Sequence, residues 1–497
     1  MDRLLDLLAG QREGPGRRRV RAFRTAPRRP EAGGIARRCA VAVPPGFFHD
    51  ACKTSDLLQA SCLYDPDPLR DLLAPTGATM PQPLTEPDSL TAPAHPARRF
   101  SAHHRWVILG IGIAAQAAFS AAFQGIPTTS TVLRGAYHLT DRTLGLVLSA
   151  VSLGIAVSEV AWGIWTDRFG ERRVLLTGLL STGAVLALMA AAVVPHDGRV
   201  PAVGVLAAGL LLVGVLGGSV NGSSGRAVMA WFRDGRRGLA MSLRQTAVPA
   251  GGAVGSALLP WLAVGFGFRA VYGVLALFCF AAAAAAHRWM HAPDTTGPAA
   301  GTSSRGDGPG RRSPLRDGTV WRLALASGLL TLPQFAVLAF VGVFLHDVHH
   351  AALAVGATAV VVVQVGGAVA RVLSGHWTDR HPGSRRPYVR FTGLAATAAL
   401  AAAALLTHAP TAAVVPALVI AGILANAWHG VAYTEIAQMA GAERAGTALG
   451  LENTTVFAAA FLAPVLVPLL AGISWPLVWA ACAAATLVAV PLAPAKE

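Results

Sequence analysis

The stretch GIWTDRFGERR at residues 163–173 returns in a close copy, GHWTDRHPGSRR, at residues 375–386. Both copies keep the core Trp-Thr-Asp-Arg and end on two arginines, and both interrupt long apolar sequence. A second pair follows in the same order, because RRGLAMSLRQT at residues 236–246 aligns with RAGTALGLENT at residues 444–454. Two repeats in one order predict a duplicated chain whose halves run in parallel orientation.

The composition is that of a membrane protein rather than of a soluble enzyme. Hydrophobic residues make up 53% of the chain and charged residues only 13%, whereas soluble domains carry more charge. The 41 Lys and Arg exceed the 26 Asp and Glu, and the resulting net charge of +15 indicates a membrane surface before it indicates nucleic acid. The cysteines show no paired spacing, and HExxH, GxSxG and GxxxxGK patterns are absent from the sequence. We therefore predict no metal site, no cofactor and no enzyme activity.

Apolar segments long enough to cross a membrane, which takes about 20 residues, follow one another from Trp106 onward. We place twelve of them, six on each side of a Gly/Ser/Pro-rich linker. They lie at approximately 106–126, 143–166, 174–194, 203–227, 239–263, 268–288, 320–345, 352–375, 388–407, 411–435, 445–470 and 474–492. The prediction is an all-α membrane protein with two parallel six-helix repeats.

The predicted domain order has four parts. Residues 1–104 are rich in Pro and Arg without an apolar period, which is typical of a disordered extension. A start at Met80 would leave only a short polar arm before the first span, so Met80 is a possible true start. Residues 105–288 form the first six-helix bundle, residues 289–318 form a flexible linker, and residues 319–492 form the second bundle.

The arginines predict the orientation in the membrane. They gather in loops on one side, together with those just before the first span. The opposite side holds only Arg134, Arg142, Arg199 and Arg269. Because positively charged short loops stay in the cytoplasm, we predict that the extension, the linker and both termini are cytoplasmic. The location that this implies is the cytoplasmic (inner) membrane of a bacterium.

The repeated loop resembles the loop signature of the major facilitator superfamily, which begins with Gly, has Asp-Arg four residues later, and continues with Gly and a basic pair. Glu171 stands where the family often has Arg. The resemblance covers residues 106–492 and implies that family's fold, two helix repeats around a central cavity. A narrower similarity links RRGLAMSLRQTAVPAGG to bacterial cyanate, oxalate/formate and monocarboxylate permeases. The matching positions are Gly163, Asp167, Arg168, Gly170, Arg172 and Arg173 in the first copy and Gly375, Asp379, Arg380, Arg385 and Arg386 in the second.

These loops predict a cytoplasmic gate. Asp167, at the end of the second span, can sit near the N-terminal end of a neighbouring helix, where partial positive charge favours a carboxylate. Arg168, Arg172 and Arg173 can then pair across the helix bundle, and Arg226 in the fourth span is a further anchor for the gate. The alternative is that the arginines only fix the topology.

Four charges inside the spans predict a transport site, because a charge in hydrocarbon is costly unless it faces a partner or a water-filled cavity. Glu159 and Arg371 occupy matching positions of the repeat, as do Arg244 and Glu452. In the family's architecture the arginines would meet as a clamp for a carboxylate or similar planar anion. The glutamates would meet as a proton-coupling site. The alternative is an ion-pair lattice in which the glutamates only neutralise the arginines.

Polar side chains of other spans complete the predicted site. Asn426, His429 and Tyr433 of the tenth span share one helical face, and we expect that face to line the cavity. Gln116 of the first span and Gln334 of the seventh offer donors and acceptors that can orient a ligand. Hydrogen bonding between helices is the alternative role for both.

The sequence therefore predicts a secondary transporter that works by alternating access in a lipid bilayer. Proton-coupled uptake of a small organic anion is the leading function, with protons and that anion as partners and no nucleic acid. Proton-driven drug efflux is a second candidate, although it would favour a cavity dominated by carboxylates and aromatic rings. A receptor with the same fold that does not transport its ligand is a third.

Overall fold

The computed structural model describes residues 103–196, 198–232, 235–291 and 313–495. Nearly all of the predicted extension at residues 1–104, including Met80, lies outside these ranges, as do residues 292–312 of the predicted linker. The regular structure within them is helical, apart from one isolated β-bridge between His196 and Arg199.

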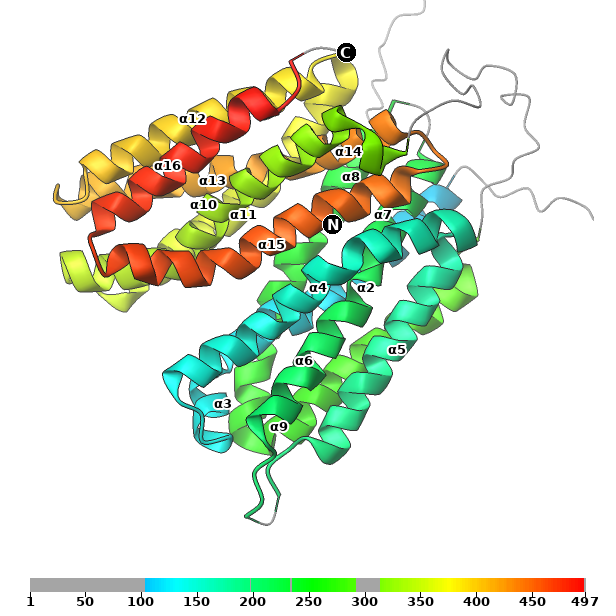
Figure 1. Cartoon of the computed structure of the whole chain (residues 1–497), viewed down its shortest axis with the longest axis vertical. Helices are drawn as coiled ribbons and strands as arrows, with labels where there is room; N and C mark the ends of the chain where they lie inside the picture. Colours follow the sequence, from blue (N-terminus) through cyan, green and yellow to red (C-terminus); the bar gives the residue numbers. More distant parts are fainter. Residues whose placement is uncertain (1–102, 197, 233–234, 292–312, 496–497) are drawn as a thin grey trace, which may run out of the picture. The chain divides into compact units, whose positions relative to one another are not determined.

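The first repeat comprises the helices up to Trp289 (Figure 1). They are α2 (His104–Thr128), α3 (Ser130–Ala136), α4 (Asp141–Phe169), α5 (Glu171–Ala192), α6 (Val203–Gly217), α7 (Ser219–Trp231), α8 (Arg237–Gln245) and α9 (Ala247–Trp289). Helices α6 and α7 together make one apolar span, Val203–Trp231.

The second repeat begins after a short 3-10 helix, η2 (Pro314–Arg316). It comprises α10 (Gly318–His349), α11 (Leu353–Arg380), α12 (Arg385–Leu405), α13 (Thr411–Ala427), α14 (His429–Ala440), α15 (Ala445–Ala471) and α16 (Trp475–Leu492). Helices α13 and α14 form one span, Thr411–Ala440, as α6 and α7 do in the first repeat.

One apolar span is far too long for a single crossing. Among the described residues eleven spans are long and apolar enough to cross a membrane, and one of them, Arg237–Trp289, has 53 residues. Its backbone breaks at Gly267, where φ is 71° and ψ is −177°. Because a positive φ is readily adopted only by glycine, this residue allows the chain to turn without a loop.

The two ends of this span lie at the same end of the molecule. Arg237 donates from Nε to the carbonyl of Phe232 at 2.8 Å, and the neighbouring Trp231 donates from Nε1 to the carbonyl of His291 at 3.1 Å. The chain therefore crosses and returns, and the eleven spans make twelve crossings. The predicted all-helical membrane fold is confirmed.

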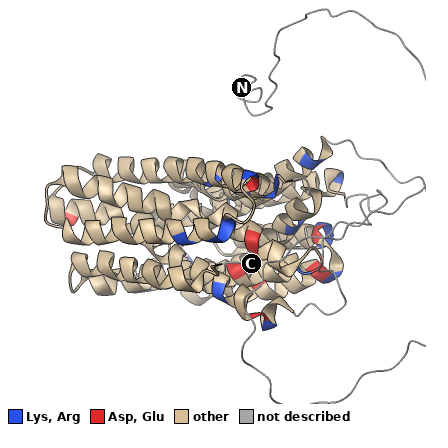
Figure 2. Cartoon of the chain, turned by 90° about the horizontal axis from the view of Figure 1, so that it is seen from above, with Lys and Arg blue, Asp and Glu red and all other residues tan. Residues whose placement is uncertain are grey.

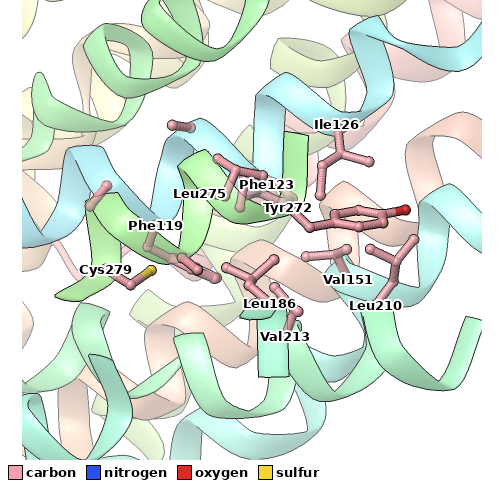
Figure 3. Packing of buried hydrophobic residues seen from close by; sticks show 14 of the residues in the cluster. Phe119, Phe123, Ile126, Val151, Leu186, Leu210, Val213, Tyr272, Leu275 and Cys279 are labelled. Carbon is pink, nitrogen blue, oxygen red and sulfur yellow. The ribbon is translucent and has the colours of Figure 1, made fainter. Parts of the chain in front are cut away.

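Two kinds of residue pack the first repeat: glycines where helix backbones approach closely, and large apolar residues where the helices lie farther apart. Where α9 crosses α2, Gly255 lies so close to Gly125 that a Cβ on Gly255 would be 2.9 Å from the Gly125 Cα. Such close approach of backbones is how helices associate where lipid offers no hydrophobic driving force. Phe119 and Tyr272 fill the wider spaces between the helices (Figure 3).

The two repeats meet along α15 and α8. Helix α15 of the second repeat packs against α4 and α7 of the first, and α8 of the first packs against α11 and α14 of the second. Most charged positions lie toward one end of the helices (Figure 2). The two repeated loops, between α4 and α5 and between α11 and α12, are at this end, so the meeting of the repeats places charged side chains against helix ends.

We predict that Gly255→Ala lowers the stability of the protein by about 1–3 kcal/mol, because overpacking a tight contact forces the backbones apart. Thermal unfolding of the detergent-solubilised protein measures this. Gly265→Ala is the matched control on the same helix, since a Cβ there meets no atom within 4 Å. Equal unfolding temperatures for both variants would contradict the close-approach argument.

Candidate functional site

Asp167 joins the two repeats by capping a helix of the other one. Its Oδ1 accepts the backbone N–H of Gly446 at 2.8 Å, and its Oδ2 accepts the N–H and the hydroxyl of Thr447 at 2.7 and 2.6 Å. The first N–H groups of a helix have no partner within it, and the helix dipole favours a negative charge there. Asp167 at the end of α4 therefore satisfies the start of α15. Gly163 allows the approach, because a Cβ there would be 3.0 Å from the Gly446 carbonyl carbon.

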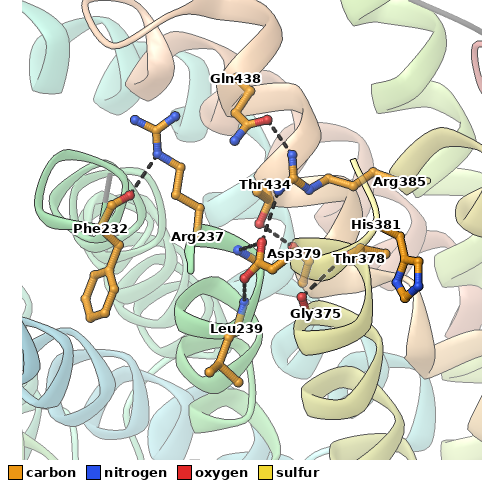
Figure 4. A network of polar contacts seen from close by, with 12 residues as sticks. Phe232, Arg237, Leu239, Gly375, Thr378, Asp379, His381, Arg385, Thr434 and Gln438 are labelled. Carbon is orange, nitrogen blue, oxygen red and sulfur yellow. Dashed lines mark hydrogen bonds and ion pairs between the residues drawn. The ribbon is translucent and has the colours of Figure 1, made fainter. Parts of the chain in front are cut away.

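Asp379 makes the same contact in the opposite direction. Its Oδ1 accepts the N–H of Gly238 at 2.9 Å and its Oδ2 that of Leu239 at 2.8 Å, so the end of α11 caps the start of α8 (Figure 4). A Cβ on Gly375 would be 2.8 Å from the Gly238 carbonyl carbon. We call these two contacts the aspartate caps: Asp167 on α15 and Asp379 on α8.

Arginines hold each cap from within its own repeat. The Arg226 guanidinium of α7 lies with Nε 3.2 Å from Asp167 Oδ1 and also forms an ion pair with Glu171. Arg385 of α12 lies with Nη2 3.0 Å from Asp379 Oδ1 and donates from Nη1 to Gln438 at 2.5 Å. Glu171, the departure from the family pattern, is therefore an ion-pair partner that sequence reasoning missed.

The other predicted gating residues lie around the caps without joining them. Gly170 has φ 83° and makes the turn between α4 and α5. The Arg168 guanidinium lies 5.4 Å from the centre of the Phe169 ring, and Arg172 donates to the carbonyl of His287 at 2.8 Å. Arg173 and Arg380 are exposed.

The expected pairing of Arg168, Arg172 and Arg173 across the bundle is therefore not what the structure shows. Arg226, which lies deeper on α7, takes that position instead. A cavity of about 580 Å³ opens beside this cap. Its lining residues are Ile164, Asp167, Arg168, Arg226, Ser313, Pro314, Leu315, Glu443, Arg444 and Thr447.

Behind the caps, Arg244 is buried in hydrogen bonds of the first repeat. It is 1% exposed, and its Nε donates to the hydroxyl of Ser224 at 2.9 Å. Its Nη2 donates to Gln116 Oε1 at 2.8 Å and to the Asn221 carbonyl at 2.6 Å. The side chain of Asn221 in turn donates to Glu159, which is fully buried. Asn221 thus bridges a cation and a carboxylate.

Arg371 spans the boundary between the repeats. It is 2% exposed, and it donates to Asn426 twice, from Nε to the carbonyl at 2.9 Å and from Nη2 to Oδ1 at 2.6 Å. Its Nη1 donates to the carbonyl of Gln245 on α8 at 3.0 Å. All three acceptors are neutral oxygens.

Glu452 is fully buried on α15, and Ser327 of α10 donates its hydroxyl to Oε1 at 2.8 Å. The other oxygen, Oε2, is buried and has no hydrogen-bond partner among the described residues. This arrangement leaves half of the carboxyl group unsatisfied.

Tyr433 lies among these charges. Its hydroxyl donates to Asn453 Oδ1 at 2.5 Å, in the neighbourhood of Glu159, Arg244, Glu452 and Arg371. The His429 ring stacks on Trp428, with 3.9 Å between ring centres, and lies nearly parallel to the Tyr433 ring. Its Nδ1 lies 3.2 Å from the Asn426 carbonyl oxygen.

We call the connected set the polar layer. It consists of Gln116, Glu159, Asn221, Ser224, Arg244, Gln245, Ser327, Arg371, Asn426, His429, Tyr433, Glu452 and Asn453. The predicted site residue Gln334 is buried on α10, and its Oε1 has no hydrogen-bond partner among the described residues.

The four buried charges have neutral hydrogen-bond partners. Asn221 donates to Glu159, Ser327 donates to Glu452, and Arg371 donates to the carbonyl of Gln245, the residue after Arg244. No ion pair within 4.0 Å joins any two of the four charges in the part of the chain that the structure describes. Amides and hydroxyls stand between them, which the sequence signalled only weakly: Gln245 and Asn453 follow Arg244 and Glu452 at matching repeat positions.

Comparison with known proteins gives one family match and several relatives. The family model described as Major Facilitator Superfamily matches residues 110–464. An uncharacterized MFS-type transporter of Mycobacterium tuberculosis (strain ATCC 25618 / H37Rv) is 33% identical over 396 residues, which are 79% of this chain and 85% of that protein.

Solved structures share the fold at low sequence identity. The proton:xylose symporter XylE, bound to 6-bromo-6-deoxy-D-glucose, has a TM-score of 0.62 at 15% identity, covering 79% of this chain and 95% of that one. The human organic anion transporter MFSD10 has a TM-score of 0.62 at 14% identity, covering 78% and 99%.

We predict that Asp167→Asn opens the contact between α4 and α15, because an amide has one oxygen where the carboxylate uses two as acceptors. Labelling of a cysteine introduced in place of the buried Ala445, at the start of α15, by a membrane-impermeant reagent should rise several-fold over the same cysteine in an otherwise unchanged chain. Asp317→Asn is the matched control, since Asp317 caps α10 within its own repeat by accepting the N–H of Thr319 at 2.8 Å. Unchanged labelling in Asp167→Asn would refute a role of this cap in closure.

Proposed function

The chain belongs to the Major Facilitator Superfamily of membrane transporters, and from this premise we propose that it takes up a small organic anion together with protons. Transport in this proposal works by alternating access between the two repeats. The observation that carries it is Arg371, a buried cation at the meeting of the repeats whose three hydrogen bonds all go to neutral oxygens.

A bound anion would supply the counter-charge that Arg371 lacks in this conformation. A buried charge is stabilised by a counter-charge and by hydrogen bonds, and here the hydrogen bonds are present while no carboxylate of the described residues lies within 4.0 Å. A substrate carboxylate can replace the neutral acceptors and take two parallel donors of the guanidinium. Arg244 is the second cation of the layer, although Glu159 already compensates part of its charge.

We propose that the anion binds to six residues of the polar layer and to Gln334 of α10, which lies outside that layer. The proposed binding residues are Gln116, Arg244, Gln334, Arg371, Asn426, His429 and Tyr433. The rings of His429 and Tyr433 and the amides of the others are of the kind that orient a ligand in a mostly apolar pocket.

Alternating access would use the aspartate caps as the closed gate. The caps tie each repeat to a helix start of the other, so both must part before the polar layer opens at their end. We place this end in the cytoplasm of a bacterium, with both termini on the same side, because the charged loops gather there. In this orientation the present conformation is closed toward the cytoplasm.

The two buried carboxyl groups are the candidates for the proposed proton coupling. Glu159 and Glu452 lie in the layer that the anion would occupy, and carboxyl groups inside membrane proteins commonly mark proton pathways. Among proteins of the same fold, XylE is named a proton symporter and MFSD10 an organic anion transporter. Efflux of cations is less well supported, since the two arginines would repel a cation.

We predict that the purified protein in liposomes accumulates a carboxylate anion when the outside is acidic and accumulates no hydrophobic cation. Uptake of radiolabelled monocarboxylates, dicarboxylates, cyanate and cations, with and without a proton gradient, measures this. Accumulation of cations driven by the opposite gradient would establish efflux instead.

We further predict that Arg371→Lys lowers uptake of that anion about tenfold or more, because it loses the paired donors and a hydrogen bond to a charged group is worth about 1.5–3 kcal/mol. Arg322→Lys is the control, because Arg322 is exposed at the start of α10 and donates to the Pro491 carbonyl at 2.8 Å. Normal uptake by Arg371→Lys would contradict the proposal that Arg371 binds the anion through paired donors.

A further inference from the structure

The two buried glutamates have different surroundings, although they occupy one polar layer. Both are fully buried, and each has one oxygen, Oε2, without a hydrogen-bond partner among the described residues. The difference lies in the group that faces the other oxygen. Asn221 faces Glu159, whereas Ser327 faces Glu452.

Glu159 belongs to a charge-compensated unit. The amide of Asn221 donates to Glu159, and the carbonyl of the same residue accepts from Arg244 Nη2 at 2.6 Å. No ion pair within 4.0 Å joins Glu159 and Arg244 among the described residues, so Asn221 is the group that connects them. An ionised Glu159 therefore fixes the amide that fixes the arginine, and protonation would weaken that unit.

Glu452 has no such cation. Its recorded partner is the neutral hydroxyl of Ser327, and no described arginine or lysine lies within 4.0 Å of it. An ionised carboxylate here would keep a full charge, away from water, with one oxygen unsatisfied, and that is costly. A carboxylic acid removes the charge and turns the free oxygen into a donor.

The helices around α15 place few charged groups near Glu452 that would change the free-energy cost of ionising it. Ser327 is the polar group that α10 turns toward Glu452. Helix α16 has only Cys482 as a titratable residue, and η2 carries Arg316 at the end of the chain segment before α10. The remaining titratable side chains on helices packed against α15 near the layer are Glu159 on α4, Arg226 on α7, and His429, Tyr433 and Glu435 on α14. Arg226 and Glu435 are engaged with Asp167, Glu171 and Arg386.

We infer that Glu452 alone is the proton-binding residue of the transport cycle, and that Glu159 stays ionised as a positioning residue for Asn221 and Arg244. This inference rests on the proposed function in taking the proton as the coupling ion. It separates two carboxyl groups that share full burial and an unpartnered Oε2 among the described residues.

The position of Glu452 connects the proton to the gate. Glu452 lies on α15, about 10 Å from the helix start at a rise of about 1.5 Å per residue, and Asp167 caps that start. A change of charge at Glu452 therefore acts on the same helix whose first N–H groups hold the repeats together. Between them, Gly450 packs against α4 so closely that a Cβ there would be 3.1 Å from the Glu159 carbonyl carbon.

Infrared difference spectroscopy of the full-length protein in lipid, between acidic and alkaline pH, tests the inference without a substrate. The C=O stretch of a protonated carboxyl group in an apolar environment is the signal, and the proton itself is the probe. We expect Glu452→Gln to remove the signal of one carboxyl group and Glu159→Gln, equally buried and equally conservative, to retain it. Loss of the signal in Glu159→Gln, or its retention in Glu452→Gln, overturns the assignment.

A second variant covers the case in which Glu452→Gln does not fold. Glu452→Asp keeps the acid but moves it away from Ser327, so its carboxyl band should shift in frequency, and an unshifted band overturns the assignment. The matched Glu159→Asp should leave the band in place. No substrate enters these measurements. A result that overturns the assignment of the band therefore does not contradict anion transport, and an absence of anion transport does not contradict the assignment of the band.

Discussion

Backbone N–H groups at two helix starts, each bound by an aspartate of the other repeat, hold this molecule in its present form. Helix α15 needs acceptors for its first N–H groups, and so does α8; water or a local cap usually supplies them. Here Asp167 and Asp379 supply them from across the boundary. The same hydrogen bonds thus complete two helix ends and join the two repeats. Breaking a cap would leave helix N–H groups without these acceptors and would also remove a contact between the repeats.

Duplication with inverted charge explains the chemistry of that layer. Arg244 and Glu452 stand at one repeated position and Glu159 and Arg371 at the other. A neighbouring asparagine serves either sign, because an amide is both donor and acceptor. Asn221 turns its Nδ2 toward Glu159, and Asn426 turns its Oδ1 toward Arg371. A repeat can therefore exchange a carboxylate for a guanidinium without rebuilding the helix beside it, and two copies of one architecture come to hold opposite charges.

Sequence reasoning reached the fold because its signals are local and periodic. Span lengths, the repeated loop and the run of arginines each depend on a few neighbouring residues. The partners of the buried charges depend instead on which rotamers fit between helices. Asn221 donates to Glu159, and Arg226 rather than Arg172 reaches the cap. Glu171, which stands where the family often has Arg, is an ion-pair partner of Arg226. This departure from the family pattern, together with an arginine inside an apolar span, was the available clue.

The turn at Gly267 joins the two arms of α9 through one residue instead of a loop. The first arm follows α8, whose start Asp379 caps. The second arm returns to the same end, where Arg172 of α5 donates to the His287 carbonyl at 2.8 Å. Helix α5 in turn follows directly on the loop of Asp167. The two caps are therefore connected within the first repeat by a continuous path of helices and one hydrogen bond, so a displacement of one cap relative to the other has to be accommodated along α8, α9 and α5.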